Sequence, residues 1–129
     1  GDREQGHLAT LVGANLVKFN QMLLLTLPGT PVFNYGDEIG LEDKDGTKFP
    51  QMIWDKSEDA ANETVKDEVK RRGDLRTFFK SLSELRSKER SLLHGEFVPL
   101  HSDNSSLAYL RSWDQSKRYL AAFNWGEDA

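Results

Sequence analysis

The chain is 129 residues long and carries 17 basic and 21 acidic side chains, for a formal net charge of −4. This length allows one modest hydrophobic core or pieces of two larger domains. Charges of both signs are interspersed without a basic stripe, which argues against nucleic acid as a partner. The sequence has no cysteine, so these residues hold neither a disulfide nor a thiolate metal site.

The first half of the chain predicts a helix followed by a strand. Apolar residues recur every three to four positions from Leu8 to Leu27, which indicates one buried helix. Pro28-Gly29 ends it, because proline breaks the helical hydrogen-bond ladder and glycine tolerates the left-handed cap. Residues 30–35 then read as a strand whose proline, Pro31, stands at its tolerated start, and Gly36 ends the strand.

A polar stretch and a second helix come next. Residues 41–73 contain a turn signal at 43–46 and one apolar island at 52–54, and they predict a long loop of the kind that carries function or is disordered. A helix is predicted from Asp74 to about Leu93, closed by His94-Gly95 and with basic side chains near its carboxyl end. Its expected inward-facing residues are Leu75, Phe78, Phe79, Leu82 and Leu85.

After Gly95 the hydrophobic pattern changes to a period of two. It predicts strands at 96–100, 107–111 and 118–123, with 114–117 as the turn between the last two. An antiparallel sheet with an exposed edge is therefore expected. We interpret residues 96–129 as the beginning of a separate β domain that is truncated here.

Asp37 and Glu38 are the main candidates for acid–base chemistry. They follow the predicted strand at its carboxyl end, the face on which α/β barrels carry their active sites. Glycoside hydrolysis needs two carboxylates facing each other across one bond, and adjacent residues rarely provide that geometry. Ordering of the loop is therefore the favoured interpretation of this pair over catalysis.

The other side chains that often carry chemistry form no recognisable pattern. His7, His94 and His101 are too scattered for a metal site, and surface or helix-cap positions are expected for them. No Gly-x-Ser-x-Gly elbow or phosphate loop occurs, so neither nucleophilic catalysis nor a bound cofactor is expected. The three tryptophans, Trp54, Trp113 and Trp125, are more typical of core or rim anchors than of sugar platforms.

Two tripeptides bear on the cellular compartment of the protein. Asn62-Glu63-Thr64 and Asn104-Ser105-Ser106 fit the N-glycosylation pattern and fall in polar segments, which favours secretion. No signal-peptide pattern opens the chain, which leaves either a cytosolic protein or an excised part of a longer one. The longest apolar run, 22–27, is far shorter than the ~20 residues that span a bilayer.

The segment from Leu27 to Gly40, with Leu-Pro-Gly-Thr-Pro and Tyr-Gly-Asp-Glu-Ile-Gly, resembles the region of the eighth barrel strand in the α-amylase superfamily, glycoside hydrolase family thirteen. Met-Ile-Trp-Asp at 52–55 is similar to that family's motif in the following loop. The resemblance covers nearly the whole chain. The residues matching these motifs, expected to be structural, are Pro28, Gly29, Pro31, Tyr35, Gly36, Asp37, Glu38, Gly40, Trp54 and Asp55.

The resemblance implies an α/β fold class: the C-terminal part of a TIM-type (β/α)8 barrel followed by the start of an antiparallel β-sandwich domain. Residues 1–95 would supply the last part of the barrel, namely a helix, the eighth strand, a long loop and the eighth helix. Residues 96–129 would begin the C-terminal all-β domain. The superfamily's catalytic acids follow the fourth, fifth and seventh strands, which would lie upstream of Gly1, and Asp2 is not part of the Asn-His-Asp triplet of the seventh.

Within this superfamily the chain is most similar to the heavy subunits of heteromeric amino-acid transporters, solute carrier family three. The similarity is carried by the stretches TLPGTPVFNYGDEIGL, ANETVK, LRSKERSLLHGEF and SWDQSKRYLAAFN. It implies a non-catalytic, extracellular part of a type II plasma-membrane glycoprotein without cofactor or metal. An upstream cysteine would form a disulfide with a multi-span light subunit, which carries the amino acid and is brought to the cell surface and stabilised by the heavy subunit.

The same resemblance places Asn62 at a position that the family glycosylates, whereas Asn104 fits only the tripeptide pattern. One alternative remains open. A glycoside hydrolase of the α-glucosidase type, with its catalytic acids upstream of this chain, would carry the same barrel motifs.

Overall fold

A computed structural model describes residues 4–44, 46–54 and 62–127. The chain divides into two compact units. Unit 1 comprises Gly1–Gln21 and Val32–Ser81, and unit 2 comprises Met22–Pro31 and Leu82–Ala129. None of the described helices is both long enough and apolar enough to cross a membrane.

The N-terminal helical region is broken where the sequence predicted one helix over 8–27. It consists of α1 (Leu8–Val12), the 3-10 helix η1 (Ala14–Leu16) and α2 (Val17–Thr26). The break is at Gly13, whose φ of 78° is incompatible with a continuing helix and easy only for glycine. The predicted stop is confirmed, because α2 ends just before Pro28-Gly29 and Gly29 takes a φ of 95°.

The prediction of a strand at 30–35 is wrong, because the structure describes these residues and assigns them no strand. This segment is irregular and is followed by a second 3-10 helix, η2 (Asp37–Ile39). A strand is defined by ladder hydrogen bonds to a neighbour, and the described part of the chain provides none alongside these residues.

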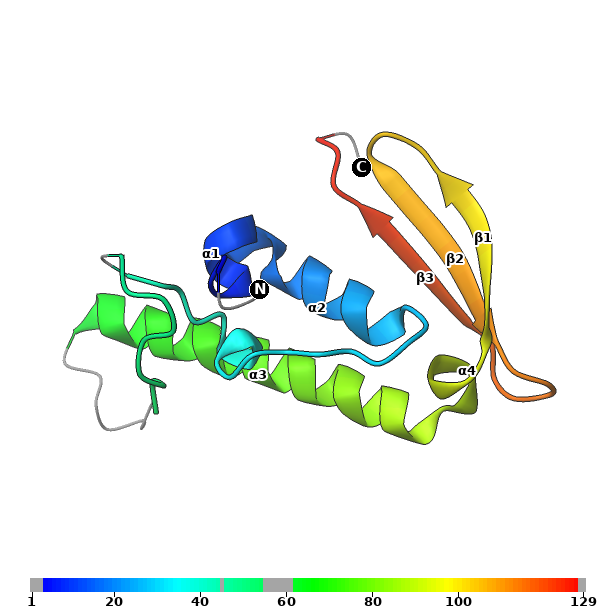
Figure 1. The fold of residues 1–129 in the computed structure, drawn as a ribbon, viewed down its shortest axis with the longest axis horizontal. Coiled ribbons are helices and arrows are strands. Elements are labelled where there is room, and N and C mark those ends of the chain that lie inside the picture. Colours follow the sequence, from blue (N-terminus) through cyan, green and yellow to red (C-terminus); the bar gives the residue numbers. More distant parts are fainter. Residues whose placement is uncertain (1–3, 45, 55–61, 128–129) are drawn as a thin grey trace. The chain divides into compact units, whose positions relative to one another are not determined.

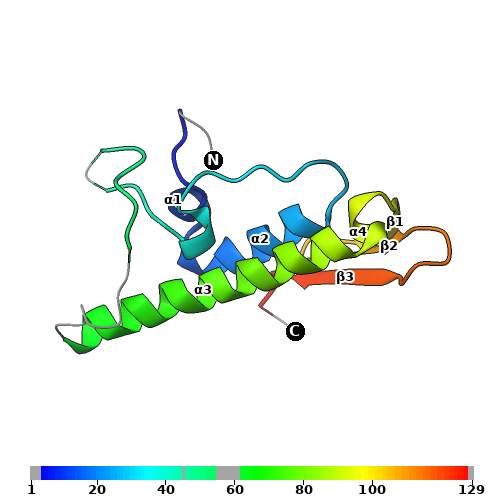
Figure 2. The same cartoon turned by 90° about the horizontal axis from the view of Figure 1, so that it is seen from below.

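The second long helix, α3 (Glu63–Lys88), starts well before the predicted Asp74 and runs without interruption (Figure 2). Its N-cap is Asn62, whose side-chain oxygen accepts the Val65 N–H at 2.9 Å. Val65 and Val69 extend the stripe that Leu75 begins, so the polar composition of 63–73 concealed one partly buried helical face. The helix does not continue to Leu93: Glu89 is extended, and the short α4 (Arg90–Leu93) follows.

Unit 1 has a small apolar core made of Ala9, Val17 and Leu75, with Val12 packed against it. Of the five side chains on α3 that were expected to face inward, only Leu75 is fully buried, and the other four are partly exposed. Phe79 packs edge-on against Phe33, with 4.8 Å between the ring centroids.

Unit 2 contains one antiparallel sheet of three strands, in the order β1 (Glu96–Ser102), β2 (Ser106–Ser112) and β3 (Tyr119–Asn124) (Figure 1). All three predicted strands are therefore confirmed, each slightly longer or shifted at its ends. One face is buried by Tyr109, Arg111, Ala121 and Phe123, and the rings of Tyr109 and Phe123 stack at 5.9 Å.

Two buried arginines in unit 2 bind the carboxyl end of α2. The last carbonyls of a helix have no partner within the helix and carry its negative dipole, so a guanidinium suits them well. Arg86 donates to the carbonyls of Leu25 at 2.8 Å, Leu27 at 3.0 Å and Gly29 at 2.6 Å.

Arg111, on β2, completes this arrangement. It donates to the Thr26 carbonyl at 2.6 Å and to the Gly95 carbonyl at 2.9 Å. The neighbouring Tyr109 hydroxyl lies 2.6 Å from the Thr26 hydroxyl. The first strands of the sheet and the end of α2 are thus held together within unit 2 by buried polar contacts.

We predict that Gly36→Ala lowers the free energy of unfolding by about 2–4 kcal/mol, because it adds an unfavourable φ to a steric overlap. Gly36 has a φ of 86°, and a Cβ there would lie 2.6 Å from Leu41 Cδ2. Gly46→Ala is the matched control, since Gly46 has a φ of 74° but nothing within 4 Å of its Cβ position. Chemical unfolding of the full-length variants checks this, and equal losses at the two positions would contradict it.

Candidate functional site

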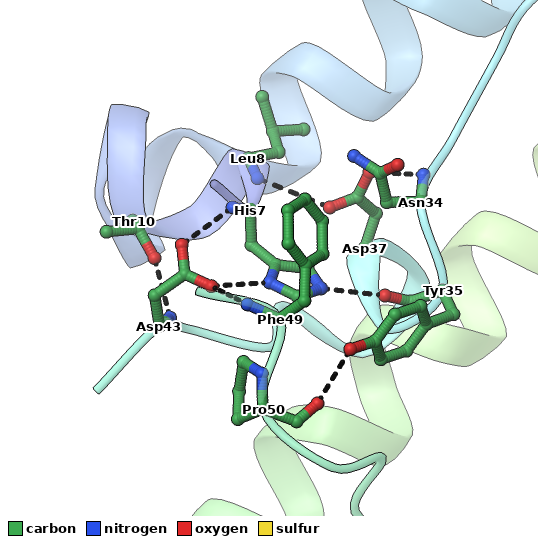
Figure 3. A network of polar contacts seen from close by, with 9 residues as sticks. All are labelled: His7, Leu8, Thr10, Asn34, Tyr35, Asp37, Asp43, Phe49 and Pro50. Carbon is green, nitrogen blue, oxygen red and sulfur yellow. Dashed lines mark hydrogen bonds and ion pairs between the residues drawn. The ribbon is translucent and has the colours of Figure 1, made fainter. Parts of the chain in front are cut away.

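A cluster of buried and partly buried polar contacts lies in unit 1, where residues before α1 meet the segment around η2 (Figure 3). Its ionisable members are His7, Asp37 and Asp43. The sequence singled out Asp37, whereas His7 was expected at a surface or helix-cap position and Asp43 only as part of a turn. The structure therefore brings together one predicted residue and two that were not recognised.

His7 is fully buried, which corrects the expectation of a surface position; it is the N-cap residue of α1, as the helix-cap alternative expected, although its side chain makes no capping hydrogen bond. Its Nδ1 lies 2.8 Å from Asp43 Oδ1, and its Nε2 lies 2.9 Å from the Tyr35 carbonyl oxygen. A carbonyl can only accept, so Nε2 carries a hydrogen. The contact between Nδ1 and Asp43 is an ion pair when the ring is protonated. The ring is packed between Tyr35 and Phe49, with centroid distances of 5.3 and 4.8 Å.

Asp43 is the centre of this cluster. Its carboxylate accepts the backbone N–H of His7 at 2.8 Å and that of Phe49 at 2.9 Å, as well as the His7 ring contact. Burial alone would raise the pKa of this carboxyl, but the hydrogen bonds from His7 and Phe49 outweigh it and lower the pKa from 3.8 to about 2. Gly6 is required beside it, because a Cβ there would overlap the carboxylate.

Asp37 and Glu38 occupy different environments although they are adjacent. Asp37 is only 4% exposed, and its two oxygens accept the N–H groups of Leu8 at 3.3 Å and Asn34 at 2.9 Å. The Leu8 N–H is the first of α1, where a carboxylate is favourable. Glu38 is partly exposed and makes no hydrogen bond or ion pair with the described residues.

The remaining motif residues are spread over the chain instead of converging on one site. Pro28 and Gly29 are exposed, Pro31 is partly buried, and the Tyr35 hydroxyl donates to the Pro50 carbonyl at 2.8 Å. Gly40 has a φ of 68° and approaches Leu75 closely. Trp54 is 76% exposed, and Asp55 lies outside the described residues.

No tryptophan in the described ranges is a core anchor, since Trp113 and Trp125 are also exposed, at 41% and 45%. Among the residues that the structure describes, no group of three His, Cys, Asp or Glu side chains is placed to hold a metal ion. His94 and His101 are exposed, as expected from the sequence.

Both asparagines of the glycosylation pattern are exposed. Asn62 is the N-cap of α3, so its side-chain oxygen is engaged while its amide nitrogen is the atom that would carry a glycan. Asn104 lies in the turn between β1 and β2, where its carbonyl accepts the Trp125 indole N–H at 3.0 Å.

We predict that Asp43→Asn flattens the acid dependence of stability. The pKa of Asp43 is lower in the folded protein than its ordinary value of 3.8, so its stabilising effect is complete above that pH and is lost as the pH falls towards 2. The difference in unfolding free energy between wild type and variant should therefore shrink over this range. Chemical unfolding measured at several acidic pH values checks it, and a difference that stays constant would contradict it.

Comparison with known proteins identifies relatives along almost the whole chain. No protein-family model matches. The amino acid transporter heavy chain SLC3A2 of Oryctolagus cuniculus is 44% identical over 98% of this chain and 26% of its own length. The Rattus norvegicus SLC3A2 heavy chain is 42% identical over 95% of this chain and 25% of its own length. The SLC3A1 heavy chain of the same species is 32% identical over 100% of this chain and 23% of its own length.

These relatives are much longer, so the chain spans about a quarter of their length. A weaker match is Neopullulanase 2 of Thermoactinomyces vulgaris, 34% identical over 78% of this chain and 16% of the enzyme.

Solved structures with the same fold are α-amylase-type enzymes. A debranching enzyme from Nostoc punctiforme superposes with a TM-score of 0.68 at 20% identity, covering 95% of this chain and 23% of the enzyme. The AmyP variant E221Q superposes with a TM-score of 0.59 at 17% identity, covering 95% of this chain and 26% of AmyP. The predicted fold class is confirmed, and the chain is homologous over nearly all its length to the amino acid transporter heavy chains, with α-amylase-type enzymes as more distant relatives.

Proposed function

We propose that this chain is part of the extracellular, non-catalytic domain of the heavy subunit of a heteromeric amino-acid transporter. The observation that carries the proposal is the identity of 42–44% to heavy chains over at least 95% of the chain. The role is to deliver a multi-span light subunit to the plasma membrane and stabilise it there, while the light subunit moves the amino acid. Residues 1–95 end the barrel of this domain, and residues 96–129 begin its β domain.

The link to the light subunit requires a part of the protein outside these residues. The sequence contains no cysteine, so a disulfide to the partner uses a cysteine upstream, next to the membrane helix of a type II protein. The contribution of this chain is then mechanical: it closes and stabilises the extracellular domain that the partner contacts.

The acidic pair fits this non-catalytic role. Asp37 is only 4% exposed, and both of its carboxylate oxygens hold backbone N–H groups inside the fold. A general acid or base needs a free oxygen within reach of the transferred proton. Glu38 alone does not provide the two opposed carboxylates that glycoside cleavage uses.

We predict that the full-length protein, taken from its own membranes, migrates on a non-reducing gel as a species that reduction splits in two. Mass spectrometry should identify a multi-span transporter as the second component. A protein that migrates alone before and after reduction would contradict the disulfide-linked partnership.

An enzyme of the α-glucosidase type is the alternative, supported by the 34% identity to Neopullulanase 2. The same purified protein separates the two functions. Hydrolysis of a chromogenic α-glucoside well above background, with no partner band, would favour the enzyme. No hydrolysis together with a partner band is the result expected for a heavy subunit.

We further propose that Asn62 carries a glycan, and we predict that Thr64→Ala removes it without disturbing α3. Thr64 supplies the hydroxyl of the acceptor pattern, whereas the helix cap uses the Asn62 side chain, which this variant keeps. Removing glycans with an endoglycosidase should increase gel mobility in wild type more than in the variant.

Asn62→Asp is the complementary control, because aspartate also caps helices but cannot be N-glycosylated. Asn104→Gln tests the second pattern in the same way. Identical mobility shifts in wild type, Thr64→Ala and Asn62→Asp would contradict a glycan on Asn62.

A further inference from the structure

The turn between β1 and β2 is held in one shape by an aspartate of its own. Asp103 Oδ1 accepts the backbone N–H of Ser105 at 2.8 Å and that of Ser106 at 2.7 Å, and the Asp103 N–H donates to the Ser106 carbonyl at 3.0 Å. A carboxylate that binds main-chain groups two and three residues later stabilises a turn. Asn104, the residue between them, therefore has a fixed place on the surface of unit 2.

The side chain of Asn104 is available for modification. It is exposed, and its carboxamide makes no hydrogen bond with the residues that the structure describes. Together with Ser106 it forms the Asn-x-Ser acceptor pattern of N-linked glycans. This tripeptide also occurs by chance in many proteins, so the assignment of a sugar needs a second observation.

Trp125, which follows β3, supplies that observation. Its backbone N–H donates to the Ser105 carbonyl at 2.8 Å, and its indole N–H donates to the Asn104 carbonyl at 3.0 Å. These two bonds fix the nitrogen edge of the ring beside the main chain of Asn104, although the two residues are 21 positions apart in the sequence. Trp125 is nevertheless 45% exposed, so the fold leaves much of this large aromatic side chain in water.

We propose that Asn104 carries an N-linked glycan whose first sugar packs against the indole of Trp125. The proposal rests on the extracellular location proposed above. The sugar is bonded to the carboxamide nitrogen, one short side chain away from the carbonyl that holds the edge of the indole. The C–H groups of the sugar ring then cover apolar surface of the tryptophan, which stabilises the folded turn.

Occupancy of Asn104 is measured on the full-length protein from membranes of cells that glycosylate asparagine. Trypsin cuts after Arg90 and Arg111, and the peptide between these sites contains Asn104 as its sole asparagine. Enzymatic removal of N-glycans in ¹⁸O-labelled water converts a glycosylated asparagine into a labelled aspartate, which mass spectrometry detects. We expect the label at Asn104, and an unlabelled Asn104 would overturn the proposal.

Packing on Trp125 is measured by the fall in melting temperature when the folded protein is deglycosylated. The fall should be about 1–3 °C larger in wild type than in Asn104→Gln, as expected for one aromatic contact. Trp125→Gln removes the ring but keeps a side-chain N–H, and its melting temperature should fall as little as that of Asn104→Gln. The tryptic peptide shows whether this variant still carries the sugar.

Trp113→Gln is the matched control. Trp113 is similarly exposed, at 41%, but it follows the opposite end of β2 from the Asn104 turn. Its variant should respond to deglycosylation as wild type does. Equal falls in wild type and Trp125→Gln, with both carrying the sugar, would overturn the packing.

Labelling of intact cells with a membrane-impermeant biotin reagent separates this proposal from the proposed function. A protein that is labelled at the cell surface but has no sugar on Asn104 overturns the glycan alone. A protein that is neither labelled nor glycosylated overturns the glycan together with the extracellular location.

Discussion

The structure depends on satisfying main-chain hydrogen-bonding groups where the chain has no regular element to do so. Buried backbone N–H and C=O groups must find partners, and in this protein charged side chains provide many of them. In unit 1 the carboxylates of Asp37 and Asp43 accept N–H groups from the segment before and at the start of α1 and from the irregular segment near η2. In unit 2 the guanidiniums of Arg86 and Arg111 donate to carbonyls at and beyond the end of α2.

Because charged side chains bind main-chain groups in this way, a segment that resembles an active site can be structural. The acidic pair comes directly after the segment that the sequence predicted as a barrel strand, and carboxylates at the ends of such strands carry the chemistry of barrel enzymes. Here the first acid of the pair is turned inward and bound by backbone donors, and the second makes no hydrogen bond with the described residues. The same barrel motif is therefore compatible with the proposed heavy subunit, which needs no reacting group, since function is decided by the site and not by the fold.

Sequence patterns predicted the local features of this fold and missed those created by contacts distant in sequence. The three strands of the sheet and the stop at Pro28-Gly29 were predicted because alternation and turn residues are local signals. The break at Gly13 was missed because a single glycine within a helical pattern is usually tolerated. The early start of α3 was missed because Val65 and Val69 are its only apolar residues before Leu75. The burial of His7 had no local signal, since its partners lie 28 and 36 residues away.

Asp37 holds the main chain in place, whereas Glu38 does not. The unfolding free energies of Asp37→Asn and Glu38→Gln in the full-length protein test this difference between the two acids. The amide introduced by Asp37→Asn would keep one acceptor oxygen and turn its NH₂ group against a backbone N–H, so we expect this variant to lose about 1–3 kcal/mol of unfolding free energy. For Glu38→Gln we expect the unfolding free energy to change by no more than about 0.5 kcal/mol. Unchanged stability for both variants, with a loss of transport or of glucoside hydrolysis, would contradict it.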